Sequence, residues 1–254
     1  MSPSTRIQIS KIEDTYPKAM TNQDLIAKVA DILKPYGYGE TTLLASALCC
    51  DEVNRELEKD FHSTYGDHFS MGGLAGFAFG GLTSFGAMAH HIPAGGSCLV
   101  LYGPHVGIDS DGNVGKINRR GRISAGACCG SATAAAGFVK SVREGKASGD
   151  VAFPDDVVDA QQHFVGTMLL PYGERLEKAP EPAAELPLAL FDAQNEMMEE
   201  IVSMGCGEVH GPGRIALLGG VQINTPQGMP DYFLPLRFEI RDNSNKLIDK
   251  LLWT

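Results

Sequence analysis

Residues 41–61 read TTLLASALCCDEVNRELEKDF, and this stretch decides the fold class. Its first half, residues 41–50, is an apolar run whose length suits a buried strand, although its Ala and Leu content leaves a helix open as an alternative. Its second half, residues 51–61, is rich in charged side chains and predicts a helix. Cys49 and Asp51 therefore lie at a strand-to-helix junction, where α/β sheets build their sites.

The rest of the chain alternates in the same way and predicts a single α/β domain over residues 1–254. Residues 1–20 are expected to form an extended arm or a short strand, and residues 179–185, rich in Pro and Ala, a linker between two helices. Thr21 or Asn22 is expected to cap a helix whose buried face carries Leu25, Val29, Ile32 and Leu33. Further strands are predicted at 97–102, 215–223 and 232–240, and further helices at 129–143, 155–170 and 186–204.

Composition and charge argue against several classes of partner. The net charge of −10 disfavours nucleic acid, because a phosphate backbone needs a basic face, although Arg119, Arg120 and Arg122 could bind a small anion. The first twenty residues lack the apolar region of a signal peptide, so the six cysteines are expected to stay reduced, in a cytosolic or plastid-type compartment. The Gly-rich segment 72–89 predicts a tightly packed buried segment rather than a membrane span.

Three residues at the ends of predicted elements are candidate ligands of one zinc ion. Cys49 follows the first strand, His105 follows the strand at 97–102, and Cys129 opens a helix. Two thiolates and one imidazole leave a fourth zinc position open for water, as catalytic zinc requires. The competing candidates are the neighbouring thiols Cys50 and Cys128 and the histidines His90 and His91. In the alternative without metal, the cysteines are small buried side chains and His105 is a hydrogen-bonded loop residue.

Two charged residues close to Cys49 fit a role in the same site. Asp51 can orient a water molecule beside the metal. Arg55, four residues further on, can keep Asp51 ionised and fix its rotamer through charge-assisted hydrogen bonds.

Several longer blocks resemble a known family. They are residues 48–55, 70–85, 90–93 (HHIP), 102–109, 114–116 and 128–132 (CCGSA). Together they resemble the low-CO₂-inducible protein family of LCIB/LCIC type, a β-carbonic-anhydrase-like group also called θ-type carbonic anhydrase.

The resemblance implies a β-carbonic-anhydrase-like central sheet flanked by helices, zinc held by two Cys and one His, an Asp–Arg dyad and a homodimer. It also implies an enzyme, a carbonic anhydrase that hydrates CO₂ reversibly to bicarbonate in support of a CO₂-concentrating mechanism. Zinc would activate a water for attack on CO₂, with Asp51 and Arg55 positioning it and His91 carrying the released proton. Residues 72–85 would form the apolar wall of the CO₂ pocket. The expected location is the plastid or cytoplasm of an alga or microbe.

Two other functions stay open at this point. A non-catalytic scaffold or bicarbonate-related protein of the same family would keep the site without hydrating CO₂. A metal-free enzyme would use Cys129, at a helix N-terminus, as a nucleophile with a histidine as its base.

Overall fold

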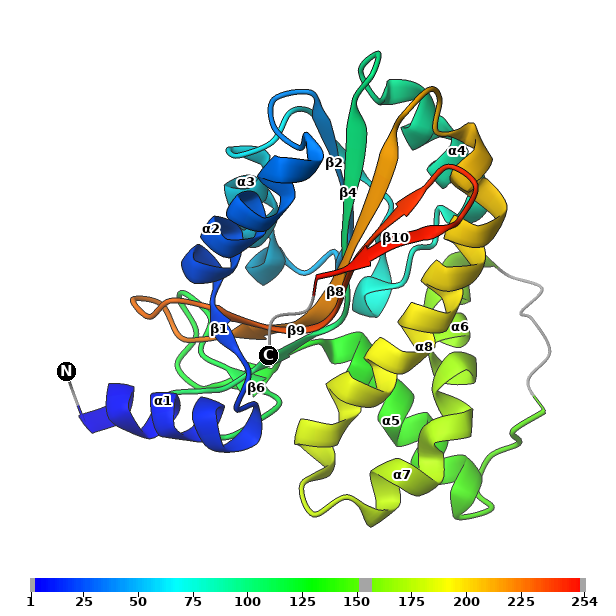
Figure 1. Ribbon diagram of the computed structural model, residues 1–254. Coiled ribbons are helices and arrows are strands. Elements are labelled where there is room, and N and C mark those ends of the chain that lie inside the picture. The colour runs from blue at the N-terminus through cyan, green and yellow to red at the C-terminus, as the bar shows by residue number, and fades with distance from the viewer. Residues whose placement is uncertain (1–2, 151–156, 252–254) are drawn as a thin grey trace.

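The protein was analysed as a computed structural model that describes residues 3–150 and 157–251. Its centre is a mixed sheet with the strand order β1-β9-β8-β4-β2-β3, in which β10 pairs with β9 and β5 with β8 (Figure 1). Strands β2, β3, β4, β5 and β8 run parallel to one another, whereas β9 runs antiparallel to β8. The strands of this sheet are β1 Met20–Thr21, β2 Thr42–Ala47, β3 His68–Ser70, β4 Ser97–Tyr102, β5 His105–Gly107, β8 Arg214–Asn224, β9 Tyr232–Asp242 and β10 Leu247–Lys250. A small separate sheet pairs β6 Lys116–Ile117 with β7 Gly126–Ala127.

Helices cover both faces of the central sheet (Figure 1). The sheet packs through one buried cluster against α2 and α3, and through another against α4 and α8. Successive residues of β2 alternate between these clusters, since Leu43 faces one and Leu44 the other, as a strand buried on both faces requires. The helices are α1 Pro3–Thr15, α2 Asn22–Leu33, α3 Arg55–His62, α4 Gly81–His91, α5 Gly130–Arg143, α6 Ala160–Leu169, α7 Gly173–Lys178 and α8 Pro182–Gly205. The predicted α/β fold, a central sheet flanked by helices, is confirmed.

Several predicted elements agree closely with the structure. Thr21 caps α2 by accepting a hydrogen bond from the backbone N–H of Asp24, and Leu25, Val29 and Leu33 form its buried face. The strand predicted at 97–102 is β4, and the helix predicted at 129–143 is α5. The helix predicted at 155–170 starts outside the described residues, which contain α6 from Ala160.

Two predictions about irregular segments are wrong. Residues 3–15 form helix α1 rather than an extended arm, because the spacing of Ile12 and Tyr16 buries both on one side of the chain, and the Tyr16 hydroxyl donates to the Ala184 carbonyl. The supposed linker at 179–185 contains the start of α8. Pro182 fits there because the first turn of a helix needs no hydrogen bond from its N–H groups.

Within residues 3–150 and 157–251, no helix is both long and apolar enough to cross a membrane. The Gly-rich segment predicted to be tightly packed and buried contains a short turn, Leu74–Gly76, followed by α4. Its residues Ala75, Phe77 and Phe85 are fully buried.

A cluster of four charged side chains ties α8 to β9. Glu239 accepts hydrogen bonds from Arg237 and Arg241 at 2.6 and 2.8 Å, and both arginines also pair with Glu199 of α8. Burial by itself would raise the pKa of Glu239, but the two guanidinium groups outweigh it and hold this pKa below its ordinary value.

Glu239→Gln should therefore lower the free energy of unfolding at pH 7 by about 1.5–3 kcal/mol, the range for a hydrogen bond to a charged group. Because the folded-state pKa lies below the unfolded value of about 4.3, this stabilisation is complete above that value and is lost as pH falls through the folded pKa. Urea unfolding at pH 7 and pH 3 measures it. Glu144→Gln, in an exposed pair with Lys140 and Lys146, is the control and should change stability little at either pH. An equal loss for Glu239→Gln at both pH values would contradict the role of its charge.

Candidate metal centre

Cys49 lies two residues beyond the end of β2, at the carboxyl edge of the parallel strands. Its thiol is buried, and its carbonyl accepts hydrogen bonds from Arg55 Nη2 at 2.5 Å and Asn54 Nδ2 at 3.4 Å. These bonds fix the backbone of the turn between β2 and α3. They therefore also fix the orientation of the Cys49 side chain.

His105 begins β5, directly after the chain turns at Gly103 and Pro104. Gly103 has a φ of +147°, and a Cβ there would lie 1.8 Å from the Gly220 carbonyl oxygen, so only glycine allows β4 and β8 to approach this closely. The imidazole is buried, and its Nδ1 lies 2.9 Å from Asn224 Oδ1. Its other nitrogen, Nε2, is buried with no hydrogen-bond partner among the described residues.

Cys129 is the residue that precedes the first turn of α5. It has the left-handed backbone conformation, with φ 61° and ψ 83°. This conformation costs a non-glycine residue roughly 1–3 kcal/mol and is typical of functional sites, where the surrounding structure maintains it. The free N–H groups and the dipole of α5 stabilise negative charge at this position, although the contact with Cys49 and burial together raise the pKa of the thiol.

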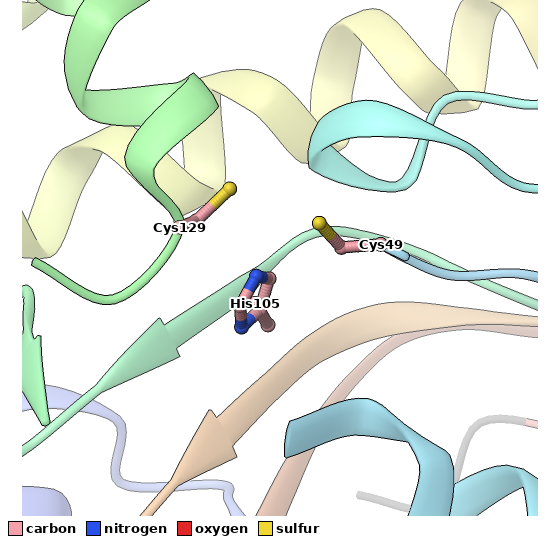
Figure 2. Close-up of side chains that lie close together, drawn as sticks. All are labelled: Cys49, His105 and Cys129. Carbon is pink, nitrogen blue, oxygen red and sulfur yellow. The ribbon is translucent and has the colours of Figure 1, made fainter. Parts of the chain in front are cut away.

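The structure brings Cys49, His105 and Cys129 together (Figure 2). Their potential ligand atoms lie within 4.8 Å of one another, and all three residues are buried. Figure 2 shows the two thiols and the imidazole converging from the β2–α3 junction, the start of β5 and the start of α5. A buried imidazole with an unpartnered nitrogen, close to two buried thiols, fits a zinc ion, because Cys and His are its usual ligands.

The competing residues are not part of this group of three. Cys50 is exposed. Cys128 is buried, but its sulfur lies 3.5 Å from Nδ1 of His105, the nitrogen that faces Asn224. His90 lies 3.8 Å from Glu208 and beside the ring of His210.

The three residues of the cluster change one another's ionisation. The neighbouring Cys129 thiol, and after it His105, lowers the pKa of Cys49 to about 4, against the opposing effect of burial. The same contact with Cys49, together with burial, raises the pKa of Cys129. Burial would lower the pKa of His105, but Cys128, Cys129 and Cys49 raise it well above its ordinary value. One thiol of the cluster is therefore favoured as a thiolate, the form that binds metal.

Asp51 pairs with Arg119, and the prediction of Arg55 as its partner is wrong. Arg119 donates to both carboxylate oxygens, at 2.9 and 2.7 Å, and also pairs with Glu52. Arg55 instead forms an ion pair with Glu58 at 2.6 Å, because the helical spacing of three residues turns it toward that side chain. Burial would raise the pKa of Asp51, but the hydrogen bonds from Arg119 hold it at about 2. Asp51 Oδ2 lies 3.9 Å from Nε2 of His105, so the carboxylate borders the cluster.

The structure does not place His91 near the cluster. It is exposed at the end of α4, and its ring packs edge-on against Phe69 with the centroids 5.5 Å apart. Phe69 of β3 pairs with Ala45 of β2. Ala45 lies four residues before Cys49, which corresponds to about 13 Å along an extended chain. Helix α4 precedes the start of β4, at the amino edge of the parallel strands. The cluster lies beyond the end of β2, at the opposite, carboxyl edge. Its expected role as proton carrier therefore has no support in the geometry.

Apolar residues and two cavities surround the cluster. Ala75 and Phe77, from the segment predicted to wall the site, share a buried apolar group with Cys49 and Cys129. A cavity of about 450 Å³ is bordered by Arg119 and Asn224. Another of about 370 Å³, between α5 and α8, is bordered by His105 and Cys128.

Two residues of this region were not found by sequence reasoning in their observed positions. From the sequence, Arg119 is expected only to form part of a possible anion site with Arg120 and Arg122. Asn224 was not singled out, although it ends a long strand at the same edge of the sheet as Cys49 and His105, which is the signal that could have identified it.

The sheet and the cluster define an α/β protein with a candidate Cys₂His metal centre. The family model of the limiting CO₂-inducible proteins B/C beta carbonic anhydrases matches residues 19–242. The chain belongs to this family, and the resemblance inferred from the sequence blocks is confirmed.

Solved structures agree with this assignment. The crystal structure of PtLCIB4, described as a homolog of the limiting CO₂-inducible protein LCIB, is 46% identical, with a TM-score of 0.91 over 96% of this chain and 100% of that one. The crystal structure of LCIB itself is 21% identical and has a TM-score of 0.70 over 94% of this chain and 98% of that one, a likeness of fold. A comparison with curated proteins finds no match.

Proposed function

We propose that this protein catalyses the zinc-dependent, reversible hydration of CO₂ to bicarbonate, with Cys49, His105 and Cys129 as the metal ligands. The observation that carries the proposal is the buried cluster of Cys49, His105 and Cys129, in which Nε2 of His105 has no hydrogen-bond partner among the described residues and lies 3.9 Å from Asp51 Oδ2. Membership of a carbonic-anhydrase family supports it. Zinc, when bound, supplies Lewis-acid chemistry that brings the ionisation of a water molecule toward neutral pH.

The side chains around the cluster have separate tasks in this proposal. Asp51 accepts a hydrogen bond from the attacking oxygen and so directs a lone pair of that oxygen at CO₂. Arg119 keeps Asp51 ionised and fixes both of its carboxylate oxygens. Ala75 and Phe77 provide an apolar surface suited to CO₂, a substrate without charge or dipole.

The direct test is bound metal per chain and CO₂ hydration, measured on the same sample purified without chelator. About one zinc per chain with hydration is expected, as for a three-ligand catalytic site. Zinc without hydration would favour a non-catalytic member of the family. A zinc-free protein in which one cysteine is alkylated rapidly would favour a thiol nucleophile instead.

Arg119 offers a second test, because it distinguishes the observed partner of Asp51 from the one expected from the sequence. Arg119→Gln should lower kcat/KM for hydration by roughly 10–100-fold, since the carboxylate loses the bonds that hold it in position. Arg55→Gln should have a smaller effect, because its contacts are with Glu58 and a backbone carbonyl. Stopped-flow hydration assays at matched zinc content compare the two, and a larger loss for Arg55→Gln would contradict the role given to Arg119.

The assembly and the biological setting are also proposals. A homodimer is supported by the family resemblance. Light scattering after size exclusion measures the mass directly. A role in CO₂ concentration is supported by the description of the family as limiting CO₂-inducible. Its loss should then slow growth of the host at low CO₂ and not at high CO₂, and a tagged copy would distinguish plastid from cytoplasm.

A further inference from the structure

The two nitrogens of His105 have different surroundings. Nε2 is buried without a hydrogen-bond partner among the described residues and lies 3.9 Å from Asp51 Oδ2, whereas Nδ1 lies 2.9 Å from Asn224 Oδ1 and 3.5 Å from the sulfur of Cys128. An imidazole that binds metal through Nε2 carries its proton on Nδ1 and needs an acceptor there. The amide oxygen of Asn224 is a strong acceptor at short distance, and the sulfur is a weak one further away. Asn224 is therefore the residue that selects the metal-binding tautomer of His105.

The orientation of the Asn224 amide follows from its other partners. Nδ2 donates to the Val53 carbonyl at 3.2 Å and to Asp231 Oδ2 at 3.0 Å, and both partners are acceptors. A flipped amide would place its oxygen against these two oxygens and its NH₂ group against Nδ1 of His105. The hydrogen-bond pattern thus leaves one arrangement, in which the amide oxygen faces His105.

Asp231 fixes the Asn224 amide through a hydrogen bond, and Thr225 in turn fixes Asp231. Its Oδ1 accepts from the backbone N–H of Thr225 at 2.7 Å and from the Thr225 hydroxyl at 3.1 Å. Asn224 is fully buried, so these bonds are not exchanged with water. Through Val53, the same side chain also touches the segment that carries Asp51. One amide thus connects the turn after β2 with the histidine at the start of β5.

We propose that Asn224, held in place by Asp231, is a positioning residue that presents His105 to the metal through Nε2. This inference rests on the metal site of the proposed function. In this arrangement the acceptor for Nδ1 of His105 is a neutral amide and not a carboxylate. The two thiolates are then the only anions required at the ligand positions.

The first experiment uses the wild-type protein loaded with zinc and labelled with ¹⁵N-histidine. NMR correlation of ring protons and nitrogens should show His105 with a slowly exchanging proton on Nδ1 and metal on Nε2. A proton on Nε2 would overturn the inference, and this result does not depend on how any variant folds. Absence of zinc from the wild-type protein would instead overturn the proposed function.

The second experiment measures zinc transfer to a coloured chelator. Asn224→Leu should release zinc roughly 10–100-fold faster than wild type, the usual effect of removing the partner of a metal-bound histidine. The matched control is Gln222→Leu, two residues earlier on β8, whose fully buried amide lies 3.5 Å from Asp231. It should release zinc at close to the wild-type rate, although it removes a similar buried amide. Equal release rates for the two variants would overturn the inference, and melting temperatures in chelator show whether both fold.

Discussion

Cys129→Ser should leave the purified protein with less than about a tenth of the wild-type zinc, because a serine hydroxyl is a poor replacement for a thiolate ligand at neutral pH. CO₂ hydration should fall with the metal. The thiol is one of the three ligands in the proposed metal site, and it sits on a backbone that is held in the left-handed conformation at the start of α5.

The neighbouring residue provides the control. Cys128→Ser removes an equally buried thiol, one residue earlier, that faces Nδ1 of His105 rather than the ligand cluster. It should keep close to the wild-type zinc content, measured by mass spectrometry of the metal after dialysis. If Cys128→Ser loses zinc and Cys129→Ser retains it, the ligand assignment must be reversed.

Asp51→Asn has the second large expected effect. It should keep zinc and lower the hydration rate by about 10²–10⁴-fold, the range for removal of a group that handles the proton of a reacting oxygen. The amide retains the size of the carboxylate, but it pairs poorly with Arg119 and can present an NH₂ group where an acceptor is needed.

Glu52→Gln is the matched control for the loss of the negative charge of Asp51. Glu52 follows Asp51 directly and also pairs with Arg119, but 72% of its side chain is exposed. Its replacement should change the stopped-flow hydration rate only slightly, since solvent screens exposed pairs. Full activity in Asp51→Asn at wild-type zinc content would remove Asp51 from the mechanism.

Much of the site could be predicted because its residues stand at the ends of elements with clear patterns. The apolar run at 41–50 and the charged stretch after it predicted β2 and α3, and the edge of a parallel sheet is where Cys49 and His105 are expected to meet. The Ala-rich segment after Cys129 predicted α5 in the same way. In each case the local pattern and the tertiary packing favour the same structure.

The wrong predictions concern residues whose contacts in space were inferred from their spacing in the sequence. Arg55 is close to Asp51 in sequence, but its place on α3 directs it to Glu58, and the bidentate partner comes from 68 residues further along the chain. His91 was chosen for its residue type, yet α4 carries it away from the cluster. Residues 3–15 were expected to be extended, because their helix depends on burying Ile12 and Tyr16 against the rest of the protein.

The sequence by itself determined the α/β class, the positions of the main strands and helices, the family, and the three residues that the structure brings together as a candidate metal centre. Each of these follows from local periodicity, from residue types at element ends or from contiguous blocks. Only the tertiary structure decided that Arg119 holds Asp51 and that Asn224 faces His105. The physical reason is that a hydrogen bond between side chains depends on the packing of whole elements, and no pattern within either segment records which distant group will be its partner.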